Sequence, residues 1–197
     1  MEIEMSITVL HYGDVAVKAI PLLSSRMQQE SAIAHILTAL AQLSEQTIHQ
    51  IIDEIPEQDK NQIVSLLCRE NRDRILTVCN QFLKRKGTFL MLTDIQVDEQ
   101  LDVCVEVGEI DYTGLIRTFL PIAQEHLASS SDAAAALLQK LPLNNADVFL
   151  RLMPQASKDA MAAFLLNANQ EKLCALAERA AGEYGIRLSI ENLNATI

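Results

Sequence analysis

The second half of this chain repeats the first half, and no other feature of the sequence constrains the fold more strongly. Residues 1–23 match residues 101–123 at an offset of 100, and the match then continues to the C-terminus at an offset of 98. The alternating apolar residues Met1, Ile3, Met5 and Ile7 correspond to Leu101, Val103, Val105 and Val107. Identical residues also occur at Tyr12/Tyr112, Pro21/Pro121, Leu43/Leu141, Pro56/Pro154, Lys60/Lys158, Asn71/Asn169 and Gly87/Gly185. The pattern predicts one structural unit that occurs twice, as residues 1–98 and 99–197.

Each unit has the pattern of a strand, several helices and a second strand. Residues 2–10 alternate apolar and polar, which is typical of a half-buried strand, and residues 88–97, 101–110 and 186–194 are the other expected strands. Residues 97–100 are short enough to form a hairpin between the second and third strands. Because a two-stranded unit buries too little surface by itself, we expect all four strands to form one small sheet. The predicted fold is α+β and helix-rich, with both repeats joined in a single pseudo-two-fold domain.

Several residues mark the expected ends of helices. Asp14 is suited to cap a helix that begins at Val15, and Pro21 should kink that helix or begin a new one. Ser31, Ser44 and Asn71 are the next expected caps, and Ser131 or Asp132 should cap a helix that ends at Leu141. Gly87 is suited to the position just after a helix, where a left-handed backbone conformation is common.

Composition narrows the function classes. The net charge of −10 disfavours nucleic-acid binding, which needs a basic surface. The N-terminus lacks the features of a signal peptide, and no uncharged apolar run is long enough to cross a bilayer. Four widely spaced cysteines without a C-x-x-C motif are typical of reduced thiols, so we expect a cytoplasmic protein. The histidines have no zinc-type spacing, and no phosphate-binding loop or nucleophile motif occurs, so no metal, cofactor or catalytic residue is predicted.

The junction between the first strand and helix of each unit carries the residues best suited to acid–base chemistry. These are His11, Tyr12 and Asp14 in the first unit, and Asp111 and Tyr112 in the second. A pocket between the repeats, lined by both tyrosines, would place a phenol beside a carboxylate or an imidazole. The alternative is that each tyrosine packs against the adjacent helix and makes a local hydrogen bond.

Residues 94–111 form an acidic stretch without a single lysine or arginine. Alternation places Asp102 and Glu106 on the face opposite Val103, Val105 and Val107. Such a surface could bind a basic partner or a hard cation such as calcium, but no calcium-loop spacing occurs. The simpler interpretation is a solvated sheet face that resists aggregation.

The two halves differ most clearly in their last strands. Arg187 and Ser189 occupy the positions of Phe89 and Met91, so the first unit has an apolar outer face where the second has a polar one. Phe89, Met91 and Cys104 are therefore candidates for an interface patch, and the alternative is that a helix of the same chain covers them.

We expect from these features a non-enzymatic interaction or scaffold protein that binds a protein partner or a second copy of itself. The alternative is a small-ligand-binding or catalytic domain with a pocket between the repeats. A third hypothesis is that the acidic surface mimics nucleic acid and occupies a DNA-binding protein.

Overall fold

A four-stranded antiparallel sheet lies at the centre of the molecule and contains strands from both halves of the chain. The strands are β1 (Glu2–Leu10), β2 (Leu90–Val97), β3 (Asp102–Ile110) and β4 (Leu188–Thr196). They are hydrogen-bonded in the order β2-β3-β1-β4, and every pairing is antiparallel. The α+β class and the single small sheet predicted from the sequence are therefore confirmed.

The computed structural model describes residues 1–26, 31–118 and 146–197. Between β1 and β2 lie α1 (Tyr12–Arg26), α2 (Ala32–Leu40), α3 (Glu45–Asp53), α4 (Glu57–Glu70) and α5 (Arg72–Arg85). Residues 112–118 are helical, and α8 (Ala146–Leu152), α9 (Gln155–Asn167) and α10 (Gln170–Glu183) precede β4. The predictions for Pro121 and for a helix that begins at Ser131 or Asp132 lie outside the described residues.

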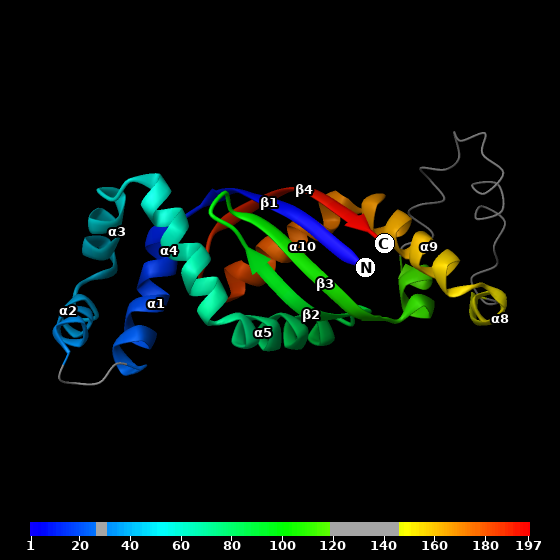
Figure 1. Ribbon diagram of the computed structural model, residues 1–197, viewed down its shortest axis with the longest axis horizontal. Coiled ribbons are helices and arrows are strands. Elements are labelled where there is room, and N and C mark those ends of the chain that lie inside the picture. Colours follow the sequence, from blue (N-terminus) through cyan, green and yellow to red (C-terminus); the bar gives the residue numbers. More distant parts are fainter. Residues whose placement is uncertain (27–30, 119–145) are drawn as a thin grey trace.

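Among the described elements, helices cover one face of the sheet, and none covers the other face. Ile3, Val103, Val105 and Val107 point toward the helices and belong to the same buried cluster as Leu165 of α9. Figure 1 shows α10 behind the sheet, α5 along the β2 side, and α1–α4 together at one end of the molecule. Helix α5 packs against β2, and α9 and α10 pack against β4. The strict alternation of the strands therefore separates an apolar inner face from a polar outer face.

Local capping signals in the sequence identify several helix ends correctly. The hydroxyl of Ser31 accepts a hydrogen bond from the Ala34 amide at 3.0 Å, and that of Ser44 accepts one from the Thr47 amide at 3.2 Å. Gly87 has φ 67° at the end of α5, and Gly185 has φ 74° at the end of α10. Both glycines stand in the left-handed conformation that closes a helix.

Two local predictions are wrong, as is one of the two alternatives for Pro21. Helix α1 begins at Tyr12 rather than Val15, so Asp14 lies inside its first turn and does not cap it. The same helix continues through Pro21, and no new helix begins there. Asn71 makes no side-chain cap for α5; its Oδ1, the atom that would accept from the helix, accepts instead from Arg26 Nη1 at 2.7 Å.

The described elements recur at the offsets of the sequence repeat. Strands β1 and β3 begin at Glu2 and Asp102, while α4 and α9 begin at Glu57 and Gln155. Duplication of one ancestral unit stays a prediction of the sequence, and the equivalence of positions is used below only to compare contacts.

Candidate functional site

The open face of the sheet carries a concentration of carboxylates, which we call the acidic face. Its acidic members are Glu2 and Glu4 on β1, Asp102, Glu106 and Glu109 on β3, and Glu191 on β4, all of them exposed. In the central strand pair Glu2 stands directly opposite Glu106, and Glu4 stands opposite Cys104. Like charges placed opposite each other destabilise a sheet. Within the described part of the chain, no lysine or arginine forms an ion pair with any of these carboxylates.

Cys104 lies near the middle of the acidic face. Burial raises the pKa of its thiol, and the carboxylates of Glu2, Glu4 and Glu106 raise it further. A thiolate is the reactive form of cysteine, so these neighbours keep Cys104 in its less reactive form. The thiol is thus suited to packing within the face and poorly suited to nucleophilic chemistry.

The three apolar residues predicted as an interface patch do not lie together. Phe89 precedes β2 and packs over Gly114, where an added Cβ atom would lie 2.2 Å from the aromatic ring. Met91 is 42% exposed and stands opposite Glu109, whereas Cys104 stands opposite Gln96. Glu109 lies five positions after Cys104, which corresponds to about 16 Å of strand. Phe89 is therefore partly buried against Gly114, and Met91 is an exposed apolar residue opposite a carboxylate.

The two tyrosines proposed to share a pocket are far apart. They follow β1 and β3, which run in opposite directions. The pairing between these two strands is centred on Glu4 and Cys104, so each tyrosine lies eight residues beyond that centre, at opposite ends. At about 3.3 Å per residue, the strands place Tyr12 and Tyr112 roughly 50 Å from each other. One pocket between the halves that includes both rings is incompatible with this topology.

Each tyrosine hydroxyl instead forms a hydrogen bond with a residue of a later helix. The partners, on α4 and α9, occupy matching positions in the two halves. The Tyr12 hydroxyl donates to Asn61 Oδ1 at 2.5 Å, and the Tyr112 hydroxyl donates to the Asp159 carboxylate. Gln155 Nε2 also donates to the Tyr112 hydroxyl at 2.6 Å. Burial and the hydrogen bond to Asp159 raise the pKa of Tyr112 to about 12. Both phenols therefore hold helices in place and remain protonated at neutral pH.

Asp14 forms an ion pair that joins the two ends of the chain. Its carboxylate accepts hydrogen bonds from Arg187 Nε at 2.8 Å, Nη2 at 3.0 Å and the backbone amide at 3.1 Å. His49 Nε2 lies 3.4 Å from the same carboxylate, which is only 10% exposed. The hydrogen bonds from Arg187 lower the pKa of Asp14 despite its burial. Asp14 is a structural residue, and Arg187 is the partner that the sequence did not identify.

The remaining two candidates at the junctions have ordinary roles. His11 is exposed. Its amide donates to the Arg187 carbonyl at 3.0 Å, and its carbonyl accepts from the Asp14 amide at 3.0 Å. Asp111 Oδ1 accepts a hydrogen bond from the Gly114 amide at 3.1 Å and so caps the helix over 112–118.

Side chains from the helices bind the free backbone groups of both edge strands. The Asn80 side chain donates to the Leu92 carbonyl and accepts from the Leu92 amide, both at 2.8 Å. Asn167 makes the same pair of hydrogen bonds with Ala195, at 3.0 and 2.7 Å. An edge strand with unpaired backbone groups is a template for strand addition. The two asparagines occupy part of that template on β2 and on β4.

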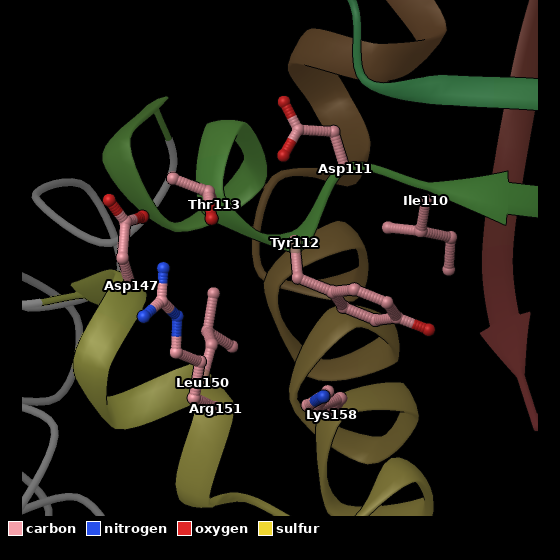
Figure 2. Close-up of a pocket in the computed structure, with 8 residues that line it drawn as sticks. All are labelled: Ile110, Asp111, Tyr112, Thr113, Asp147, Leu150, Arg151 and Lys158. Atoms are coloured by element: carbon pink, nitrogen blue, oxygen red, sulfur yellow. The ribbon is translucent and has the colours of Figure 1, made fainter.

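A cavity of about 340 Å³ opens beside Tyr112 (Figure 2), and no residue of the acidic face lines it. Its walls come from the end of β3, the helix over 112–118, α8 and α9. The charged residues of its lining are Asp111, Asp147, Arg151 and Lys158.

Comparison of the chain with protein-family models, with curated proteins and with solved structures finds no match. Among residues 1–26, 31–118 and 146–197, no three histidine, cysteine, aspartate or glutamate side chains are grouped closely enough to hold a metal ion. None of the helices in these ranges has the length and apolar character required to cross a membrane.

Proposed function

We propose that this chain is a non-enzymatic interaction protein whose acidic face binds a positively charged surface of a partner protein. The observation that carries the proposal is an open sheet face lined with carboxylates, of which, among the described residues, only Asp94 opposite Glu106 has a cationic partner, Arg72 at 3.2 Å. Complementary charge steers such partners together and fixes their orientation.

The tolerated repulsion between Glu2 and Glu106 supports this assignment. A central strand pair selected for stability alone would place opposite charges or uncharged residues at these positions. A basic partner would relieve the repulsion when it binds, so the same residues that destabilise the free sheet would stabilise the complex.

The protected edge strands support a face-on mode of binding. Because Asn80 and Asn167 occupy backbone groups of β2 and β4, a partner that adds a strand would first have to displace them. The outer face needs no such displacement.

The proposal is tested with two variants of equal net charge. The face variant carries Glu2→Gln, Glu4→Gln and Glu106→Gln, and the control carries Asp53→Asn, Glu54→Gln and Glu70→Gln, at exposed positions in or directly after α3 and α4. A helical lysine–alanine peptide serves as the basic probe, and its binding is measured by fluorescence anisotropy.

We expect the face variant to bind the peptide at least about fivefold more weakly than the control, with the difference decreasing as salt is added. Equal loss of binding in both variants would show that only net charge matters and would contradict a specific acidic face.

Self-association stays a prediction of the sequence, and the acidic face does not favour it, because two copies would bring carboxylates against carboxylates. Light scattering of the wild type at low and moderate salt tests it directly. Met91→Ser is the suitable variant, since Phe89 packs over Gly114 and its replacement would disturb the fold.

A further inference from the structure

A single short turn, between β2 and β3, connects the two halves of the chain. Residues 1–97 contain β1 and β2, and residues 102–197 contain β3 and β4. In the order β2-β3-β1-β4, every described strand pairing joins one of these parts to the other. The ion pair between Asp14 and Arg187 also crosses between them. All of these contacts can therefore form unchanged between the halves of two different copies of the chain.

The connecting turn holds a leucine in a conformation that leucine rarely adopts. Leu101 has φ 64°, in the left-handed region, and is only 4% exposed. Its amide donates to the Asp98 carbonyl at 3.2 Å, and the Asp98 amide donates to the Asp102 carbonyl at 3.0 Å. These bonds define a hairpin in which a tight turn is followed by a left-handed residue, a place that glycine usually takes.

Leu101 is the residue with the greatest backbone strain of this kind in the described part of the chain. The other non-glycine residue with positive φ there is Asn192, and asparagine tolerates the left-handed region better than leucine does. An extended connection between β2 and β3 would return Leu101 to the ordinary region of φ and remove the strain.

Two hydrogen bonds oppose the opening of this turn. Asp98 Oδ1 accepts from the Gln100 amide at 2.8 Å and from the Asp102 amide at 2.9 Å. Both bonds are exposed, so water replaces them when the turn opens and their net contribution is modest. The relief of strain at Leu101 offsets their loss, and the protein concentration then decides between one closed chain and two exchanged chains.

We propose that two copies of this chain exchange halves to form a dimer, with residues 98–101 opened into an extended connection. Each sheet of the dimer contains β1 and β2 of one copy and β3 and β4 of the other. Short connecting loops under strain favour exchange of this kind. Because exchange uses strand pairings already present, it needs no contact between two acidic faces, and it is independent of the proposed function.

Refolding from urea at low and high protein concentration, followed by size-exclusion chromatography with light scattering, tests the exchange. We expect monomer at low concentration and an additional dimer at high concentration, which is the mass-action behaviour of an association. The separated forms should interconvert slowly in native buffer, because all strand pairs must separate before the halves can exchange. A wild type that is monomeric after refolding at every concentration up to its solubility limit would overturn the proposal.

A cysteine pair distinguishes an exchanged dimer from any other dimer. Ser6 of β1 stands opposite Asp102 of β3, and their side chains are hydrogen-bonded at 2.6 Å. In a chain whose four native cysteines are replaced by alanine, Ser6→Cys with Asp102→Cys places two thiols within reach of a disulfide. After oxidation with copper–phenanthroline, the isolated dimer should run as linked pairs of chains on a non-reducing gel, and the monomer as single chains. A dimer that yields single, internally linked chains would be unexchanged and would overturn the proposal.

The contribution of strain is measured with Leu101→Gly and Leu101→Ala. Both variants remove the buried leucine side chain beyond its first carbon, but only glycine adopts positive φ without a penalty. We expect Leu101→Gly to dimerise at least about tenfold more weakly than Leu101→Ala, since two turns open in each dimer. Equal dimerisation constants would overturn the assignment of this turn as the hinge. The acidic-face variant should dimerise like the wild type, which separates this result from the test of the proposed function.

Discussion

Equivalent positions in the two halves are held together by different chemistry. Asp14 of the first half and Arg187 of the second form an ion pair, while the matching positions, Gly114 of the second half and Phe89 of the first, are in close contact. Both members of the pair differ together, because a glycine leaves room for an aromatic ring and a carboxylate needs a cation. A joint difference of this kind between matched positions of the two halves is a sequence signal for contact.

The ion pair predicts a pH-dependent contribution to stability. Because the pKa of Asp14 is lowered in the folded protein, its stabilisation is fully present above the ordinary aspartate pKa. It is lost as the pH falls through the lowered folded value. Asp14→Asn should reduce the free energy of unfolding by about 2 kcal/mol at neutral pH, as expected for a hydrogen bond to a charged group.

Urea denaturation of the wild type and Asp14→Asn at neutral and acidic pH measures this difference. The gap between the two proteins should narrow as the pH decreases, and Asp53→Asn, at an exposed position, should show no such gap. A gap that stays constant down to strongly acidic pH would contradict the assigned role of Asp14.

Cys104 makes a second prediction at this scale. In a variant that retains only Cys104, Glu2→Gln with Glu4→Gln should lower the thiol pKa, because it removes carboxylates that disfavour the thiolate. Alkylation by iodoacetamide at mildly alkaline pH should then be faster, and added salt should reduce the difference. Identical pH profiles before and after the substitutions would show that these carboxylates do not act on the thiol.

At the scale of the elements, the asparagines at the sheet edges protect the strands from pairing with other chains. Asn80→Ala should reduce the free energy of unfolding by about 2 kcal/mol, because it leaves an amide and a carbonyl of Leu92 without partners. Asn167→Ala should do the same at Ala195. Both variants should also form more oligomer in size-exclusion chromatography with light scattering.

Asn194→Ala is the matched control, since this exposed residue lies on the same edge strand as Ala195. If Asn80→Ala and Asn167→Ala behaved like the control in both measurements, the side-chain hydrogen bonds would have no protective role.

The elements show which features a sequence can reveal. The caps at Ser31 and Ser44 and the turn at Gly87 were predictable, because each depends on residues only a few positions away. The outer position of Asp102 and Glu106 follows from strand alternation alone. The Asp14–Arg187 pair joins residues 173 positions apart, and no local rule identifies such a contact.

Element boundaries were less predictable for a physical reason. Pro21 interrupts the backbone hydrogen bonds of a helix but does not end α1, which packs against α2 and α3. Tertiary packing thus compensates for a local penalty. The cavity beside Tyr112 was not predictable either, because its walls come from segments that only the fold brings together.

At the scale of the whole molecule, the strand order makes the two halves depend on each other. Strands β1 and β2 belong to residues 1–98, and β3 and β4 belong to residues 99–197. In the order β2-β3-β1-β4, every pair of neighbouring strands joins one half to the other. Of the four strands that the structure describes, no two from the same half are hydrogen-bonded to each other.

This topology predicts that neither fragment 1–98 nor fragment 99–197 folds alone. Each would expose the inner faces of two unpaired strands, which an isolated fragment cannot cover. Thermal melts followed by circular dichroism should show no cooperative transition for either fragment. An equimolar mixture should recover a transition whose midpoint rises with concentration, because assembly has become bimolecular.

A cooperative transition of fragment 1–98 by itself would mean that its helices form an independent core and that the shared sheet is secondary. Recovery only in the mixture would mean that the sheet is the step at which the chain becomes one domain, so the acidic face, which spans strands of both halves, would exist only after the halves have joined.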